Sequence, residues 1–232
     1  MAKIKLMEIF LNCGRNAVLA MPPKIRKLAA MKDAKMLIIP KALKRGIFDF
    51  DIPDKLVSEE MAERYLEIKP PVFSLIPDYQ LVINEIEQSY VIGNDFSAIS
   101  ASCVVIERLL NQARINLHKH HKTIKELWDK GPTNEWKPNI DALKKWSYLD
   151  DTFASELSDI YRDIRCRYLH CGEIKNMRKD ALRTIMAAYR LMTIFIGFPE
   201  DLFSWMGGRP SCKNEADPRF LEFYKPYIED EQ

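Results

Sequence analysis

The sequence has little glycine and few alternating runs of apolar and polar residues. Only 8 of its 232 residues are glycine, and most of these stand where a helix is expected to end. Runs of four or more residues that alternate between apolar and polar are few, so half-buried β-strands are not indicated. These absences favour an all-α fold.

The cysteines lack the spacing of a metal site or a redox motif. The chain has five, an odd number, and no two of them form a Cys-x-x-Cys pair. Cys103 falls on an apolar helix stripe, where a buried cysteine behaves as a small hydrophobic side chain. The sequence therefore predicts neither a metal centre nor a cofactor, and it indicates a reducing, cytoplasmic setting.

Long hydrophobic runs are also absent. No apolar stretch approaches the roughly 18 residues that a membrane-spanning helix needs. The chain begins with basic residues, but Glu8 interrupts the short apolar stretch that follows, so neither a cleaved signal nor a lipid anchor is expected. The sequence predicts no membrane partner.

Charge is distributed unevenly along the chain. Residues 1–46 contain eleven lysines and arginines against two acidic residues, a net charge of +9, whereas residues 47–232 carry 24 basic and 31 acidic residues, a net charge of −7. A basic arm on an acidic body either attracts a polyanion or docks onto the body itself. Both interpretations remain open on sequence alone.

Four long segments carry apolar residues at three- and four-residue steps, the spacing of a helix with one buried face. They predict a four-helix up-and-down bundle over residues 77–197, with helices at about 77–93, 94–117, 150–172 and 176–196. The residues expected to face the core are Tyr79, Val82, Ile86 and Tyr90; Phe96, Ile99, Cys103, Ile106 and Leu110; Phe153, Leu157, Ile160, Ile164 and Tyr168; and Ala181, Ile185, Ala188, Met192 and Phe195.

The remaining segments are interpreted as an extension, an insertion and a tail. Residues 1–76 are a basic N-terminal extension of unassigned fold, with one modest helix at about 54–68 before Pro70 and Pro71. Residues 118–149 look like an insertion with two short helices that tryptophans hold on the bundle. Residues 198–232 form a tail whose aromatic run is expected to cover a face of the bundle.

The third expected helix ends in several arginines and a histidine. The stretch 160–172 reads I-Y-R-D-I-R-C-R-Y-L-H-C-G. Arg162 and Arg167 each follow an aspartate by three or four residues, the spacing of an ion pair on a helix. Arg165 has no acid at these offsets. An unbalanced arginine beside other cations, near a histidine at a helix end, favours phosphate binding.

Arg165 and His170 together suit the cleavage of RNA without a metal. Histidine is a general acid or base near neutral pH, arginine stabilises charge on a phosphoryl group, and the ribose 2′-hydroxyl serves as nucleophile. The alternative is a surface arginine with a histidine that stabilises the helix dipole. Spacing alone does not decide, because Arg114 and His120 have nearly the same spacing in a histidine cluster interpreted as a solvated helix end rather than a metal site.

The outward face of the third helix has unexpected features. Leu169 and Cys166 lie on it, although a face that meets only water seldom needs them. On an ideal helix, Arg165 and His170 are about 140° apart. One chain therefore brings them together only if the helix loosens at His170.

The segment Arg165-Cys-Arg-Tyr-Leu-His170, at the end of the third helix of a bundle, resembles the Arg-x4–6-His motif of the HEPN (higher eukaryotes and prokaryotes nucleotide-binding) superfamily. The second helix, N-D-F-S-A-I-S-A-S-C-V-V-I-E-R-L-L, is similar to a small-residue-rich HEPN helix that ends in Glu-x-x-Leu. The resemblance covers residues 77–197, roughly half of the chain.

The resemblance implies a metal-independent endoribonuclease, commonly a homodimer in which two Arg/His pairs face each other. Members act as toxins, in antiviral defence and in RNA processing, and some are inactive binding modules. For this chain it implies Arg165 and His170 as the catalytic pair and RNA as the partner. Arg162 and Arg167 are expected to add substrate-binding charge. A dimer through the third helix and an antitoxin or regulatory protein are the further partners implied.

Two other residues are expected to support this pair. Glu107 should be partly buried on the second helix, where it either holds Arg165, orients His170 or pairs with another cation. Cys166 follows the arginine directly. The rival prediction is a non-catalytic HEPN-like module that binds a nucleotide, RNA or a protein, which Cys166 and the large extensions favour.

Overall fold

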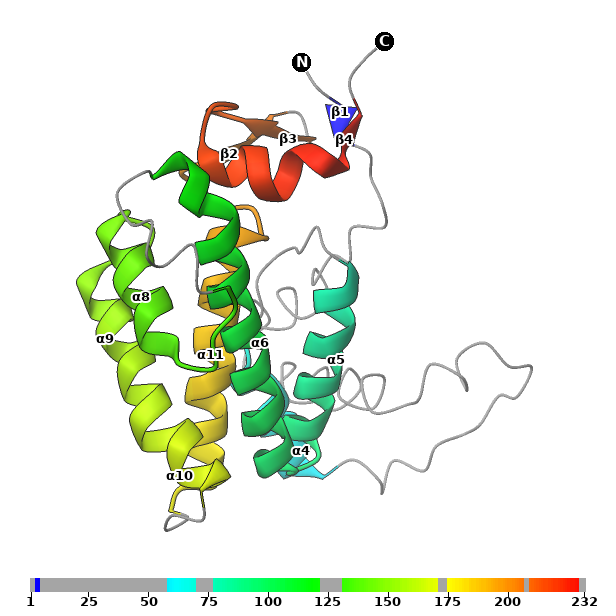
Figure 1. The fold of residues 1–232 in the computed structure, drawn as a ribbon. Coiled ribbons are helices and arrows are strands. Elements are labelled where there is room, and N and C mark those ends of the chain that lie inside the picture. The colour runs from blue at the N-terminus through cyan, green and yellow to red at the C-terminus, as the bar shows by residue number, and fades with distance from the viewer. Residues whose placement is uncertain are drawn as a thin grey trace.

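The computed structural model describes residues 3–4, 58–69, 77–121, 131–170, 175–206 and 209–229, and these are predominantly helical, as the sequence predicted. The long helical segments lie side by side (Figure 1). They are α5 (Pro77–Val91), α6 (Asp95–Leu117), a third segment made of α9 (Asp151–Asp159), the π-helical η3 (Ile160–Arg165) and α10 (Cys166–Leu169), and α11 (Met177–Phe195).

The core lies where α6 packs against both α5 and α11. The predicted stripes of the third and fourth helices are buried throughout, which confirms those two predictions. The prediction for Phe96 is wrong, because its side chain is 46% exposed. A strict seven-residue repeat drifts by about 20° per heptad on a straight helix. Two heptads separate Leu110 from Phe96, so a drift of about 40° places Phe96 at the edge of the buried face of α6.

Helix α4 (Glu59–Glu67) belongs to the same core, although the sequence placed it in the N-terminal extension. Ser58 caps it by accepting a hydrogen bond from the backbone N–H of Met61. Arg64 is buried and donates to both carboxylate oxygens of Asp95, the first residue of α6. This charge-assisted pair anchors α4 at the turn between α5 and α6.

The insertion is held on α6 by a polar ridge. Its described part contains the 3₁₀ helix η2 (His118–His120) and α8 (Trp136–Lys145), whereas the short helix expected near residue 123 lies outside the described residues. Asn111 exchanges hydrogen bonds of 2.8 Å with the backbone of Thr133. Arg114 donates to the side chain of Asn139 and to the carbonyl of Gly131.

The tail packs on one end of the helices (Figure 1). It contains an antiparallel pair, β2 (Phe203–Met206) and β3 (Arg209–Cys212), which the sequence did not predict. Of the aromatic run, Phe220, Phe223 and Tyr224 are buried, in the π-helical η4 (Phe220–Tyr224), which is followed by the 3₁₀ helix η5 (Lys225–Tyr227). The short strand β1 (Lys3–Ile4) pairs with β4 (Ile228–Glu229), so both ends of the chain meet there.

None of the described helices combines the length and the apolar character that crossing a membrane requires.

Candidate functional site

The third helical segment is not a regular α-helix where the arginines lie. Residues Ile160–Arg165 form a π-helical turn, and the backbone N–H of Cys166 donates to the carbonyl of Tyr161, five residues back. Such turns are rare and frequently occur at functional sites. Because a π turn holds more residues than an α turn, it changes the direction of Arg165 relative to the residues before the turn. The residues between Arg165 and His170 are α-helical, and the backbone leaves helical geometry only at His170.

Arg165 is held between an acid and an aromatic ring. Its Nη2 donates to Oε2 of Glu107 at 2.9 Å, and the two side chains are only 16% and 24% exposed. The guanidinium carbon lies 5.2 Å from the centre of the Tyr161 ring, close enough for a cation–π contact. The indole N–H of Trp136 donates to the same oxygen of Glu107 at 3.3 Å. Glu107 therefore positions Arg165 while it is itself positioned by α8.

His170 is the first residue after the helix ends. Its backbone leaves helical geometry, with φ −119° and ψ 33°, although its N–H still donates to the carbonyl of Cys166 at 2.9 Å. The side chain is exposed. Within the described part of the chain, its ring has no hydrogen bond or ion pair. The expected end of the helix at Gly172 lies outside the described residues, and the helix ends at Leu169.

Arg162 is an exposed cation whose charge is already balanced. It pairs with Asp159 at 2.8 Å, as predicted, and with Asp163 at 2.7 Å. Hydrogen bonds from Arg162 lower the pKa of the Asp163 carboxyl. A phosphate at Arg162 would compete with these two aspartates.

The prediction that Arg167 pairs with Asp163 is wrong. Its side chain reaches across to α11 and donates to Asp180 instead of Asp163. The hydroxyl of Tyr168 donates to the same carboxylate at 3.0 Å, and burial with this hydrogen bond raises the pKa of Tyr168 to about 12. The contact with Asp180 is favoured over one with Asp163 because the Asp180 carboxylate accepts from two donors, Arg167 and Tyr168. Arg167 thus fixes α10 against the first turn of α11.

The two cysteines near Arg165 differ in accessibility. Cys103 is buried, and burial raises the pKa of its thiol to about 12, so it stays protonated. Cys166 is partly exposed. Of these two thiols, only that of Cys166 is accessible to an external reagent.

Large exposed apolar side chains lie on α10 and α6, the helices that end or begin near this site. Leu169 on α10 is 46% exposed, and on α6 Phe96 is 46% and Val104 56% exposed. Helical spacing places Phe96 and Val104 within a quarter turn of Glu107 around α6. The face that carries the Arg165–Glu107 pair is therefore partly hydrophobic.

The histidine cluster near residue 120 has a structural role instead. The ring of His120 contacts Oε1 of Glu222 in the tail at 2.7 Å. The ring of His121 stacks on Trp146 with 4.9 Å between centroids and contacts the hydroxyl of Tyr148 at 2.9 Å. Among the residues that the structure describes, no three His, Cys, Asp or Glu side chains form a group that could hold a metal.

No protein-family model, curated protein or solved structure matches the chain.

The structure unites Arg165 with Glu107, and no hydrogen bond or ion pair between described atoms joins Arg165 to His170. Sequence reasoning missed the parts played by Trp136 and Tyr161 at this site. Tyr161 stands four residues before Arg165, a helix-neighbour spacing that could have been noticed. Trp136 is far away in sequence, and no local signal connects it to Glu107.

Proposed function

We propose that the chain is a metal-independent endoribonuclease built on a HEPN-like four-helix up-and-down bundle. The observation that carries the proposal is the π-helical turn, which presents Arg165 to Glu107 just before the helix ends at an exposed His170. A positioned cation and an accessible imidazole close together in sequence supply the two groups that cleavage by 2′-hydroxyl attack requires.

In the proposed reaction, Arg165 binds the non-bridging oxygens of the scissile phosphate. Its contact with Glu107 uses only Nη2, and a guanidinium has five N–H donors. His170 takes the proton of the 2′-hydroxyl as O2′ bonds to phosphorus. The bond from phosphorus to O5′ breaks, and the imidazolium returns the proton to O5′. The products carry a 2′,3′-cyclic phosphate and a 5′-hydroxyl.

A second copy of the chain is the proposed cover for the hydrophobic part of this face. Leu169, Phe96 and Val104 are large exposed apolar residues on α10 and α6, and they favour an interface there. In such a homodimer, Arg165 and His170 of both chains would line one cleft. The basic residues 1–46 would attract the RNA, and Arg162 and Arg167 would contribute where RNA phosphates displace their aspartate partners. An antitoxin or another regulatory protein would restrain the activity.

The test is cleavage of a labelled single-stranded RNA by wild type, Arg165→Ala and His170→Ala, with EDTA present throughout. Wild type should produce fragments that end in 2′,3′-cyclic phosphate, and each variant should be at least about a hundredfold slower. Equal cleavage by the three proteins would assign the activity to a contaminant and end the catalytic proposal.

The second candidate function is a non-catalytic module that binds RNA, a nucleotide or a protein. It is favoured by the occupied state of Arg165, whose side chain is largely buried against Glu107 and Tyr161. This candidate requires that RNA binding, measured by fluorescence anisotropy, survives in His170→Ala while wild type shows no cleavage.

A further inference from the structure

Helix α11 has an outward face that is hollowed along most of its length. Its buried residues, among them Ala181, Ile185 and Ala188, pack toward α6. Leu182, Met186 and Arg190 point about 100–180° away from that stripe and are at least partly exposed. This face is therefore separate from the side of α6 that carries the Arg165–Glu107 pair.

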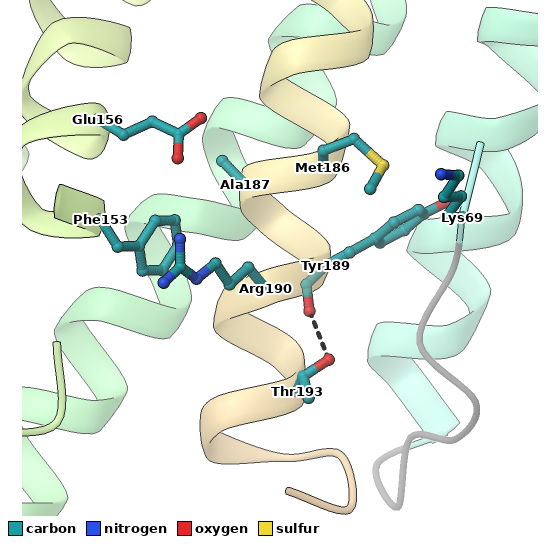
Figure 2. A pocket seen from close by; sticks show the side chains of 8 residues that line it. All are labelled: Lys69, Phe153, Glu156, Met186, Ala187, Tyr189, Arg190 and Thr193. Carbon is teal, nitrogen blue, oxygen red and sulfur yellow. Dashed lines mark hydrogen bonds between the residues drawn. The ribbon is translucent and has the colours of Figure 1, made fainter. Parts of the chain in front are cut away.

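Two hollows adjoin on this face, and together we call them the α11 groove. The first encloses about 430 Å³ between the start of α11, Glu67 and Tyr90. The second encloses about 320 Å³ between Lys69 and α9 (Figure 2). Leu182 lines the first and Met186 the second. These two residues are one helical turn apart, so the two hollows follow one another along α11.

The floor of the groove is apolar. Met177, Leu182 and Met186 are partly buried and pack against the main core. In Figure 2, Met186 and Ala187 lie on α11 between the Phe153 side of the hollow and Lys69. Methionine adapts its shape to different apolar partners. Such a floor suits apolar side chains better than the sugars and phosphates of RNA.

The rim of the groove is positively charged. Glu67 is paired with Arg178 at 2.8 Å, and Glu156 lies 3.9 Å from Arg183, so both acids of the rim already have cationic partners. Lys69 and Lys179 are exposed, and no acid pairs with either of them within the described ranges. The net charge open to a ligand is therefore positive.

We propose that the α11 groove binds an acidic amphipathic helix of a partner protein. Apolar residues at i, i+4, i+7 and i+11 of such a helix would lie on Leu182 and Met186, in the way that helices occupy hydrophobic grooves. Acidic residues beside this stripe would meet Lys69 and Lys179. The basic segment 1–46 of the chain itself is a poor occupant, because its net charge of +9 repels the rim.

The experiment uses the full-length protein and two labelled synthetic helical peptides of about 18 residues, roughly five turns. Both carry leucine at i, i+4, i+7 and i+11. One has glutamate beside the stripe and the other has lysine. Fluorescence anisotropy should show binding of the glutamate peptide, and binding of the lysine peptide should be at least tenfold weaker, or about 1.4 kcal/mol.

Substitutions locate the binding. Lys179→Glu and Met186→Glu should each weaken binding of the glutamate peptide at least about tenfold, through charge and through the apolar floor respectively. Lys137→Glu, on the exposed side of α8, is the matched control and should change little. Circular dichroism confirms that each variant is folded, and Lys179→Glu, at an exposed site, keeps the test valid if Met186→Glu does not fold.

The proposal would be overturned if the glutamate peptide did not bind, or if both peptides bound equally well. It would also be overturned if all three variants bound the glutamate peptide equally well. A fourth contrary result is that a labelled RNA, and not the peptide, binds in a way that depends on Lys179. His170→Ala should bind the glutamate peptide as wild type does. Failure of the ribonuclease proposal would therefore leave this one standing, and the reverse also holds.

Discussion

The chain contains two arginine–histidine pairs with nearly equal spacing, and the structure gives them different environments. Arg114 and His120 lie at the end of α6, where Arg114 is 1% exposed and His120 contacts Glu222 of the tail. Arg165 and His170 lie at the end of the third segment, where Arg165 faces Glu107 and His170 is exposed. In the first pair, the insertion contacts Arg114 and the tail contacts His120, whereas the ring of His170 has no hydrogen bond or ion pair among the described residues.

This difference shows that the role of a short arginine–histidine motif depends on which other segments of the chain contact it. Arg114 donates to uncharged oxygens of Asn139 and Gly131, and burial lowers its pKa. It serves to fasten the insertion. Arg165 donates to the carboxylate of Glu107 through Nη2, and its side chain is 16% exposed.

The largest expected effect concerns the two histidines. His170→Ala should slow RNA cleavage by about 10²–10⁴-fold, because it removes the proposed general acid and base. His120→Ala should leave the cleavage rate within about twofold, because a residue remote from the proposed site changes no step of the reaction. Single-turnover cleavage of one RNA measures both. If the rate falls equally in the two variants, the comparison between the pairs fails.

The second effect concerns stability, for which the first pair is expected to matter more than the second. Arg114→Ala leaves the oxygens of Asn139 and Gly131 without their donor and should cost about 3 kcal/mol, which is about 6–12 °C in Tm for a chain of this size. Arg165→Ala should cost about 1 kcal/mol, because its single ion pair is partly solvated. Thermal unfolding followed by circular dichroism gives both values. A greater loss in Arg165→Ala would make Arg165 the structural residue of the two.

The third effect tests Glu107 as a positioning residue. Glu107→Gln keeps an acceptor for Trp136 but removes the charge that holds Arg165. It should lower kcat about tenfold with KM little changed, since misplacement of a transition-state contact acts on kcat. Glu135→Gln, at an exposed site before α8, is the control. An unchanged kcat would limit Glu107 to holding α8 in place.

The smallest effect concerns the pKa of His121, which lies in the histidine cluster near residue 120. Burial lowers the pKa of His121 below 6.5, and the neighbouring His120 and His118 lower it further. At this histidine, the unfolded chain therefore binds a proton more tightly than the folded chain. The contribution of neutral His121 to the free energy of unfolding is complete above about pH 6.5, and it is lost as the pH falls through that value. Solvent screens this partly exposed group, so the fall in Tm should be only about 2 °C.

The control for this effect is His121→Phe, which keeps a ring on Trp146 but cannot take up a proton. Its Tm should fall less than that of wild type between pH 7.5 and 5.5. Identical slopes for the two proteins would mean that other groups account for the whole pH dependence.

The order of the elements could be read from the sequence because helix starts, helix ends and apolar stripes are local signals. Asp150 caps α9 by accepting from the backbone N–H of Phe153. The segment α5 begins at Pro77 as predicted, and Gly93 follows it with a φ of +89°. The short strands could not be predicted, because β1 finds its partner at the far end of the chain.

The sequence by itself determined a mainly helical protein, the core residues of its third and fourth long helices, and an arginine that no local acid balances. Only the tertiary structure decided which acid that arginine meets, since Glu107 comes from another helix and Trp136 from the insertion. It also decided that His120 contacts Glu222 of the tail while the side chain of His170 is exposed. These outcomes depend on contacts between segments distant in sequence, which helical periodicity does not encode.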